Sequence, residues 1–177
     1  MRNAPVQILL WKYLLGIKKM PQWAHLPLIM GPNGKLSKRD GAKYGFPVFA
    51  MNWIDQKSNN FTEGFKEKGF LPEAFINMLA MLGWNDGTTQ EVFSLDELIQ
   101  KFSIERVHKA GAKFDYEKAK WFNQEWIKKL DNEVLSQRVA EILKSKDIKI
   151  ANNNYLNNVI SLVKERCTLL PDFYDQT

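Results

Sequence analysis

The sequence predicts a mainly α-helical protein with a small β-hairpin and an extended N-terminal part, which is an α+β fold. Three observations lead to this prediction. The pair Asn33-Gly34, a strong hairpin signal, stands between the apolar run Leu26–Met30 and the short segment Lys35-Leu36. From residue 62 onward the apolar residues recur with the spacing of helices. Between these parts, residues 40–61 contain glycine, proline and a polar stretch, which is typical of a connecting loop.

The N-terminal third is expected to contain one helix and one hairpin. Residues 5–15 are predicted to be helical, because a proline stands in the first turn and Gly16 follows the last. The hairpin is expected to use Leu26–Met30 as one strand and Lys35-Leu36 as the other. Beyond it, the apolar run Phe46–Trp53 can pack as an extended segment.

After residue 61 the sequence carries the start signals of a series of helices. Thr62 can cap a short helix that Gly69 ends. Further helices are expected to start at Pro72, at the capping box Ser94–Glu97, at Asp115, at Asp131 or Asn132, and at Asn154 or a neighbour. The final stretch, residues 169–177, shows no helical period.

Positive charge is concentrated in the first third of the chain. Residues 1–50 hold eight Lys or Arg and one acid, for a net charge of +7, whereas residues 51–177 hold 17 basic and 19 acidic residues, for −2. This asymmetry favours contact with a polyanion, either the phosphates of a nucleotide or a nucleic-acid backbone. The alternative is an ordinary solvated basic surface.

Composition argues against several other classes of protein. No apolar run approaches the ~18 residues of a membrane-spanning helix, so no membrane partner is expected. Met1–Pro5 lacks the features of a signal peptide. The single cysteine, Cys167, cannot form an internal disulfide, and with His25 and His108 it supplies too few ligands for a structural zinc site. We therefore expect a cytoplasmic protein that supplies no metal ligands.

The segment Lys35–Arg39 is the best candidate for chemistry. Its three cations and one hydroxyl directly follow the tight turn Gly31–Gly34. Lysine is a compact charge on a flexible stem, which suits a phosphate that moves during reaction. A glycine-containing loop also permits close backbone approach. The pattern indicates an anion-binding loop, with an exposed basic turn as the alternative.

Lys35–Arg39 resembles the lysine-serine-lysine signature loop of class I aminoacyl-tRNA synthetases, in the form found in glutamyl-tRNA synthetases. Four further blocks are similar to this family and occur in the same order, so the resemblance covers about residues 4–130. These blocks are Ala24–Ile29, Gly69–Trp84, Phe93–Leu98, and Lys113–Lys118 with Trp121 and Asn123. We refer to Lys35–Arg39 as the signature loop.

The resemblance implies that the chain takes part in activating L-glutamate with ATP and its accompanying Mg2+, and in transferring it to tRNA(Glu). Lys38 matches the family's second lysine, which contacts ATP phosphates and stabilises charge as pyrophosphate leaves, so Lys38 is expected to be catalytic. Lys35 matches the first lysine, in a supporting role, and Arg39 stands at a variable position. The expected ATP-binding residues are Lys35, Leu36, Ser37, Lys38 and Arg39.

The resemblance also implies three regions. Residues 1–28 would be the end of the class I catalytic domain, and residues 29–125 the signature loop and the region that contacts the tRNA stem. Residues 126–177 would begin an α-helical anticodon-binding domain. The family's second signature, His-x-Gly-His, has no counterpart here. We therefore interpret the chain as an internal segment of a synthetase that lacks most of the nucleotide-binding domain and is inactive alone.

Two alternatives remain open at this stage. The chain could be a non-catalytic helical module that binds RNA or protein through its basic loop. Within the synthetases, the glutamine enzyme is the nearest rival, but its C-terminal region is built from β-barrels, whereas residues 115–166 have a helical period. Residues 43–61 look like an insertion relative to shorter relatives, and Trp53 in that segment is the best candidate for stacking on a base.

Overall fold

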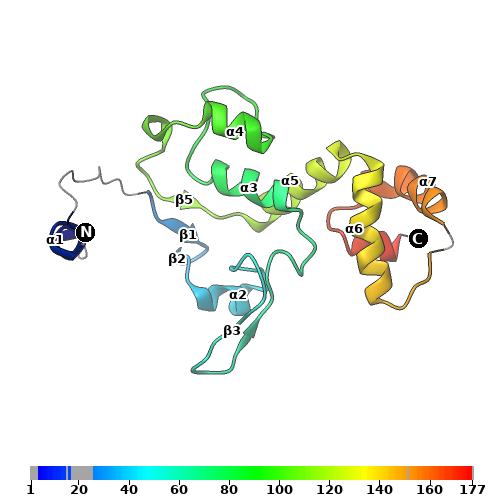
Figure 1. Cartoon of the computed structure of the whole chain (residues 1–177), viewed down its shortest axis with the longest axis horizontal. Helices are drawn as coiled ribbons and strands as arrows, with labels where there is room; N and C mark the ends of the chain where they lie inside the picture. Colours follow the sequence, from blue (N-terminus) through cyan, green and yellow to red (C-terminus); the bar gives the residue numbers. More distant parts are fainter. Residues whose placement is uncertain (1–3, 15, 17–25, 151, 177) are drawn as a thin grey trace.

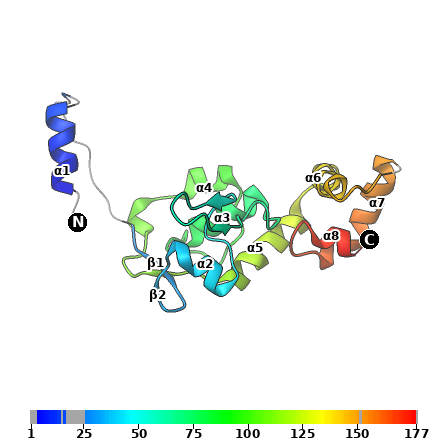
Figure 2. The same ribbon diagram turned by 90° about the horizontal axis from the view of Figure 1, so that it is seen from below.

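The computed structural model describes residues 4–14, 16, 26–150 and 152–176. Figure 1 shows a middle part of strands and helices, followed by a group of helices at the C-terminal end. The view in Figure 2, turned by 90°, shows α6, α7 and α8 grouped at this end. The predicted α+β class is confirmed, because helices dominate and two small sheets accompany them. No helix among the described residues is long and apolar enough to cross a membrane.

The N-terminal helical segment consists of α1 (Ala4–Leu9) and η1 (Leu10–Leu14). The helix predicted over residues 5–15 is therefore confirmed as far as Leu14, although η1 is π-helical. Gly16 has a φ of +61°, the left-handed conformation that glycine adopts readily after a helix.

A three-stranded sheet holds the predicted hairpin. Strands β1 (Ile29–Gly31) and β2 (Gly34–Lys35) pair antiparallel, and Gly34 takes a φ of +118° in the turn between them. The hairpin prediction is confirmed, although β1 begins three residues later than expected. The third strand, β5 (Ala112–Lys113), pairs parallel with β1 and was not predicted. Its two residues are too few to show a period, and its partner lies about eighty positions away.

The segment predicted as a loop over residues 40–61 is partly regular. Helix α2 (Lys38–Tyr44) follows the signature loop, and β3 (Trp53–Ile54) pairs antiparallel with β4 (Phe61–Thr62). The helix predicted to start at Thr62 is wrong, because Thr62 pairs with Trp53 in the hairpin. The residues that follow it form turns rather than a helix.

The α-helices of the middle part begin where the sequence predicts, and they are α3 (Pro72–Met81), α4 (Leu95–Lys101) and α5 (Tyr116–Lys129). A short 3-10 helix, η2 (Ile104–Arg106), was not predicted. The predicted capping box is present, since Ser94 Oγ accepts from Glu97 N (3.2 Å) and Glu97 Oε2 accepts from Ser94 N (2.7 Å). Asp115 caps α5 by accepting hydrogen bonds from two backbone N–H groups of its first turn.

The C-terminal helices are α6 (Asn132–Ser145), α7 (Asn153–Val163), η3 (Lys164–Arg166) and α8 (Asp172–Asp175). Asp131 caps α6 and Asn152 caps α7, in agreement with the predicted starts. Helix α8 was not predicted, because four residues are too few to show a helical period. The chain before it is held where Asp172 Oδ2 accepts from the N–H groups of Thr168 and Leu169, both at 2.8 Å.

Three clusters of buried side chains form the core. The middle core gathers seven residues from the loops, α3 and α5: Phe46, Phe65, Phe70, Met78, Phe114, Ala119 and Phe122. The helical core lies among α5, α6, α7 and the C-terminal turn, and it includes Trp126, Ile127, Leu135, Val139, Ile160 and Phe173. A small third cluster under α4 contains Trp84, Phe93 and Leu98. Because α5 contributes to the first two clusters, the predicted boundary between residues 125 and 126 falls inside a continuous helix.

Two buried asparagines join these clusters through hydrogen bonds. Asn123 Oδ1 accepts from Leu71 N (2.7 Å), while its amide donates to the carbonyl oxygen of Thr168 (2.6 Å). Asn77 Oδ1 accepts from Trp126 Nε1 (3.1 Å), so α3 is bonded to α5. A buried amide saturated in this way fixes a single packing arrangement, because any other would leave polar groups unpaired.

Candidate nucleotide-binding loop

The signature loop lies where β2 ends and α2 begins, at the edge of the three-stranded sheet (Figure 1). Lys35 is exposed, and no carboxylate of the described residues forms an ion pair with it. Leu36 turns inward and packs against the middle core, which holds the loop to the body of the protein. The alternation of exposed and packed positions leaves Lys35 free to meet an anion.

Ser37 and Asp40 define the first turn of α2. Ser37 is the N-cap residue in an extended conformation, and Asp40 Oδ2 accepts a hydrogen bond from its N–H at 2.6 Å. A carboxylate at this position satisfies a free N–H group and interacts favourably with the helix dipole. Asp40, the one acid in residues 1–50, is therefore directed back to the backbone of its own helix.

Lys38 and Arg39 are the first two residues of α2. The backbone of both residues is helical, so the signature loop continues directly into α2. Their side chains lie outside what the structure describes, and the expected contact of Lys38 with ATP phosphates stays a prediction. The described cations of the segment are Lys35 and Lys43, both exposed.

The end of α2 is fastened to the hairpin turn. Gly45 caps the helix with a φ of +73°, and its N–H donates to Gly41 O at 2.9 Å. The amide of Asn33 donates a hydrogen bond to the hydroxyl of Tyr44. The Tyr44 ring also stacks on Phe46 of the middle core, with ring centres 6.0 Å apart. The C-terminal end of the short helix is thus tied to the hairpin turn and to the middle core.

The sequence does not single out Asn33, Gly41 or Tyr44 as parts of the site. Asn33 was assigned to the turn, and its amide also reaches α2. Gly41 looked like an interruption, whereas it is a buried position inside the helix. Glycines four residues apart, just after a Ser-x-x-Asp capping pattern, were the available signal for a short helix.

Trp53, the expected stacking residue, lies on β3 and stacks on Phe49 with ring centres 4.8 Å apart. Its ring therefore already has an aromatic partner within the chain. Trp84 and Trp126 are buried, and Trp121 is half-buried. His108 is exposed, and its Nε2 lies 2.8 Å from Nδ2 of Asn85. His25 lies outside the described residues.

Cys167 and Asp86 are titratable groups away from the loop with shifted pKa values. Burial raises the pKa of the Cys167 thiol to about 11, so the group stays protonated and inert near neutral pH. Hydrogen bonds from Thr88 and Lys101 lower the pKa of Asp86 to about 2. Among the described residues, no three His, Cys, Asp or Glu side chains gather as a metal site would require.

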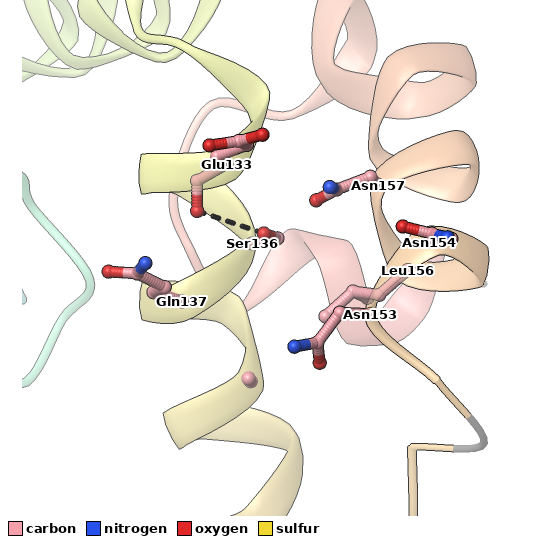
Figure 3. A pocket seen from close by; sticks show the side chains of 8 residues that line it. Glu133, Ser136, Gln137, Asn153, Asn154, Leu156 and Asn157 are labelled. Carbon is pink, nitrogen blue, oxygen red and sulfur yellow. Dashed lines mark hydrogen bonds between the residues drawn. The ribbon is translucent and has the colours of Figure 1, made fainter.

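A cavity of about 460 Å3 lies between α6 and α7 (Figure 3). Its lining consists of Glu133, Ser136, Gln137, Ala140, Asn153, Asn154, Leu156 and Asn157. Ser136 Oγ donates to the backbone carbonyl of Glu133 at 2.9 Å, and Asn157 Oδ1 is buried without a hydrogen-bond partner among the described residues. No cation lines this cavity, so it does not suit the phosphate groups that the signature loop is expected to bind.

Comparison with known proteins identifies the family. A family model described as tRNA synthetases class I (E and Q), catalytic domain, matches residues 1–121. A glutamate–tRNA ligase of Flavobacterium psychrophilum is 52% identical over 176 residues, which cover 98% of this chain and 34% of that ligase. The chain belongs to the family of class I tRNA synthetases for glutamate and glutamine. The resemblance to glutamyl-tRNA synthetases found in the sequence is therefore confirmed.

Solved structures of the same synthetase family match the fold. The crystal structure of a glutamate tRNA ligase from Elizabethkingia meningosepticum, in complex with its amino acid, aligns with a TM-score of 0.84 and 42% identity. A glutamate–tRNA synthetase from Elizabethkingia anophelis aligns with a TM-score of 0.83. Each alignment covers 98% of this chain and 35% of the other. The chain thus spans about a third of the length of its relatives.

Proposed function

We propose that this chain is the signature-loop and tRNA-facing portion of a glutamate–tRNA ligase. The complete enzyme would activate L-glutamate with ATP and transfer it to tRNA(Glu). The observation that carries the proposal is the 52% identity with a glutamate–tRNA ligase across nearly the whole chain. The position of the basic loop supports it, since Lys35 is exposed between a fixed hairpin and a capped helix.

In this proposal Lys38 holds the ATP phosphates and stabilises the negative charge that develops as pyrophosphate leaves. Positioned cations lower the barrier of such a step because they are fixed before the charge moves. Lys35 adds a second, flexible cation, and Arg39 a third. Ser37 provides the start of α2, and Leu36 anchors the loop to the core.

The residues present suit ATP phosphates better than a metal ion. The loop offers ammonium and guanidinium groups, while Asp40, its nearest carboxylate, already accepts a hydrogen bond from Ser37 N. We therefore assign phosphate binding to this loop, and Mg2+ would arrive with ATP.

We propose three regions, at residues 1–28, 29–125 and 126–177, with roles in the catalytic domain, in tRNA stem contact and in the anticodon-binding domain. The helices α6, α7 and α8 support the assignment to the glutamate enzyme rather than the glutamine enzyme, since the described residues from 132 to 176 contain no strand. The cytoplasmic location stays a prediction.

The test is the ATP–pyrophosphate exchange of the complete enzyme in the presence of glutamate and tRNA. We expect Lys38→Ala to lower the exchange rate by on the order of a hundredfold, since it removes charge stabilisation at the transferring phosphates. Lys43→Ala, an exposed lysine on the same helix, is the matched control and should stay near the parent rate. Equal rates in the two variants would refute the role of Lys38.

The 177-residue chain by itself should show no exchange, because its sequence contains no His-x-Gly-His segment to hold the adenosine. Exchange by this chain above a Lys38→Ala control would contradict that expectation. If the complete enzyme bound tRNA but formed no glutamyl-adenylate, the non-catalytic binding module would be the better assignment.

A further inference from the structure

We propose that residues 46–66 form a supporting surface, called the seat below, that fixes the position of α2. Gly41 is the positioning residue at which α2 contacts this surface most closely. The inference rests on the proposed function, because α2 carries the end of the signature loop. It assigns a role to the segment that separates the loop from the helices of the middle part.

Helix α2 depends on its surroundings for its stability. It has seven residues, whereas isolated helices shorter than about 12–15 residues are marginal in water. Its position is therefore set by what it packs against. The contacts along its buried side decide where the backbone of Lys38 and Arg39 lies.

The closest of these contacts is at Gly41, which is buried. A Cβ at this position would lie 2.9 Å from the carbonyl oxygen of Phe46 and 2.9 Å from Cγ2 of Val48. It would also lie 3.7 Å from Cγ2 of Thr62, on strand β4. The helix thus rests directly on residues 46–48, which leave no space for a side chain at Gly41, and strand β4 lies next to this contact.

The hairpin is in turn built as a rigid support. The N–H of Gly64 donates to Asn52 Oδ1 at 2.9 Å, and the N–H of Phe65 donates to Phe49 O at 2.9 Å. A Cβ on Gly64 would lie 2.2 Å from the carbonyl carbon of Met51, so the backbone segments at Met51 and Gly64 are in direct contact. Such close packing prevents one segment from sliding past the other.

The support is anchored in the middle core. Phe65, at the end of the hairpin segment, packs against Phe70 and Phe75 with ring centres 4.9 and 5.0 Å away. Its ring also meets Phe114, which directly follows β5, edge to face at 6.2 Å. Displacing the seat would disrupt these aromatic contacts, which stabilise the core beyond simple burial of the rings.

The experiment measures the hydrogen-exchange rate of the Gly45 amide, which closes α2 by donating to Gly41 O. In the 177-residue chain, Gly41→Ala should raise this rate by about tenfold, since the helix must lift from its seat. The amide of Phe102, bonded to Leu98 O at 2.8 Å in α4, serves as the internal reference and should not change. Lys43→Ala is the matched control on the exposed side of α2.

The same variants are then compared in the complete enzyme. A shift of α2 by about 1 Å should reduce ATP–pyrophosphate exchange by ten- to a hundredfold, mainly through kcat, with tRNA affinity unchanged. Adding Val48→Ala to Gly41→Ala removes one of the two closest contacts and should restore part of the rate. A residue with only a structural role would lower the melting temperature and leave the kcat of the folded enzyme unchanged.

Several outcomes separate the hypotheses. Unchanged Gly45 exchange and unchanged activity in Gly41→Ala would overturn the inference. If that variant did not fold, Thr62→Ser would replace it, because it removes only the methyl group that faces Gly41, and an unaltered Gly45 rate would then refute the seat. A complete enzyme that forms no adenylate would refute the proposed function. The hydrogen-exchange rate of Gly45 in the 177-residue chain would still test whether the seat positions α2.

Discussion

Arg138 donates two hydrogen bonds to the carboxylate of Glu73, at 2.7 and 2.8 Å, and so joins α6 to the first turn of α3. Both side chains are about two-thirds buried, at 28% and 31% exposure. The planar guanidinium matches the carboxylate with two parallel bonds, which lysine cannot reproduce. Among the described residues, it is the one ion pair that joins the middle part to the C-terminal helices.

Replacing Arg138 by lysine should lower the free energy of unfolding by about 1 kcal/mol, because one ammonium group cannot keep both hydrogen bonds. Urea denaturation of the chain measures this difference. Arg166→Lys, at an exposed arginine in η3, is the control and should change the stability by less than about 0.5 kcal/mol. Equal effects in the two variants would show that the bidentate geometry is unimportant.

Asp86 should make the chain less stable in acid. Its pKa is lowered to about 2 in the folded chain by hydrogen bonds from Thr88 and then Lys101. A depressed pKa contributes stability that is present above the ordinary value of 3.8 and is lost as the pH falls toward 2. The stability difference between the parent chain and Asp86→Asn should therefore shrink between pH 5 and pH 2. A constant difference in urea midpoint over this range would contradict the assignment.

Asn77→Ala should destabilise the chain by about 3 kcal/mol, since two buried donors and one partly buried acceptor would lose their partners. These are the N–H of Phe93 (2.9 Å), the indole N–H of Trp126 (3.1 Å) and the carbonyl oxygen of Glu91 (2.8 Å). The exposed Asn158→Ala on α7 is the control, with little expected change. The comparison uses equilibrium unfolding followed by tryptophan fluorescence.

Gly69→Ala should cost more than Gly34→Ala, although both glycines have positive φ angles, of +90° and +118°. A Cβ at Gly34 would meet nothing within 4 Å, so that variant reports backbone strain alone, about 1 kcal/mol. At Gly69 the Cβ would lie 2.2 Å from Cδ of Pro171, which adds a clash of about 1–3 kcal/mol. Similar melting temperatures for the two variants would indicate that the C-terminal turn is not packed there.

The chain should bind tRNA weakly, with an affinity that falls steeply as salt concentration rises. Each phosphate neutralised by Lys or Arg releases condensed counterions, so Lys35→Ala should reduce the log–log salt slope by about 1. Glu133→Gln, on α6, leaves the basic third unchanged and should not reduce the slope. An affinity independent of salt would exclude a phosphate-dominated contact.

The five longer helices α3 to α7 could be predicted because each has a local start signal and enough residues to display a period, whereas the short helix α8 could not. The Asn33-Gly34 turn was predictable for the same reason, since its chemistry is contained in two neighbours. Strand β5 was not, because it exists only through pairing with β1. Thr62 was misassigned since a threonine can cap a helix or pair in a strand, and only its pairing with Trp53 decides between them.

The candidate loop was likewise found from its local pattern, while its supports were not. Lys35–Arg39 carries its charge and turn chemistry in five consecutive residues. The bond from Asn33 to Tyr44 and the packing of Val48 and Thr62 on Gly41 depend on how separate segments meet. Tertiary contacts of this kind leave no periodic trace in a single sequence.

Helix α5 crosses the line between the middle core and the helical core without a break. A continuous helix cannot melt over one half while the other half keeps its shape, except at the cost of fraying several turns. Heating should therefore give a single cooperative transition for residues 29–176, not two. Proteins divided at residue 125 would each expose half of a shared helix and would tend to aggregate.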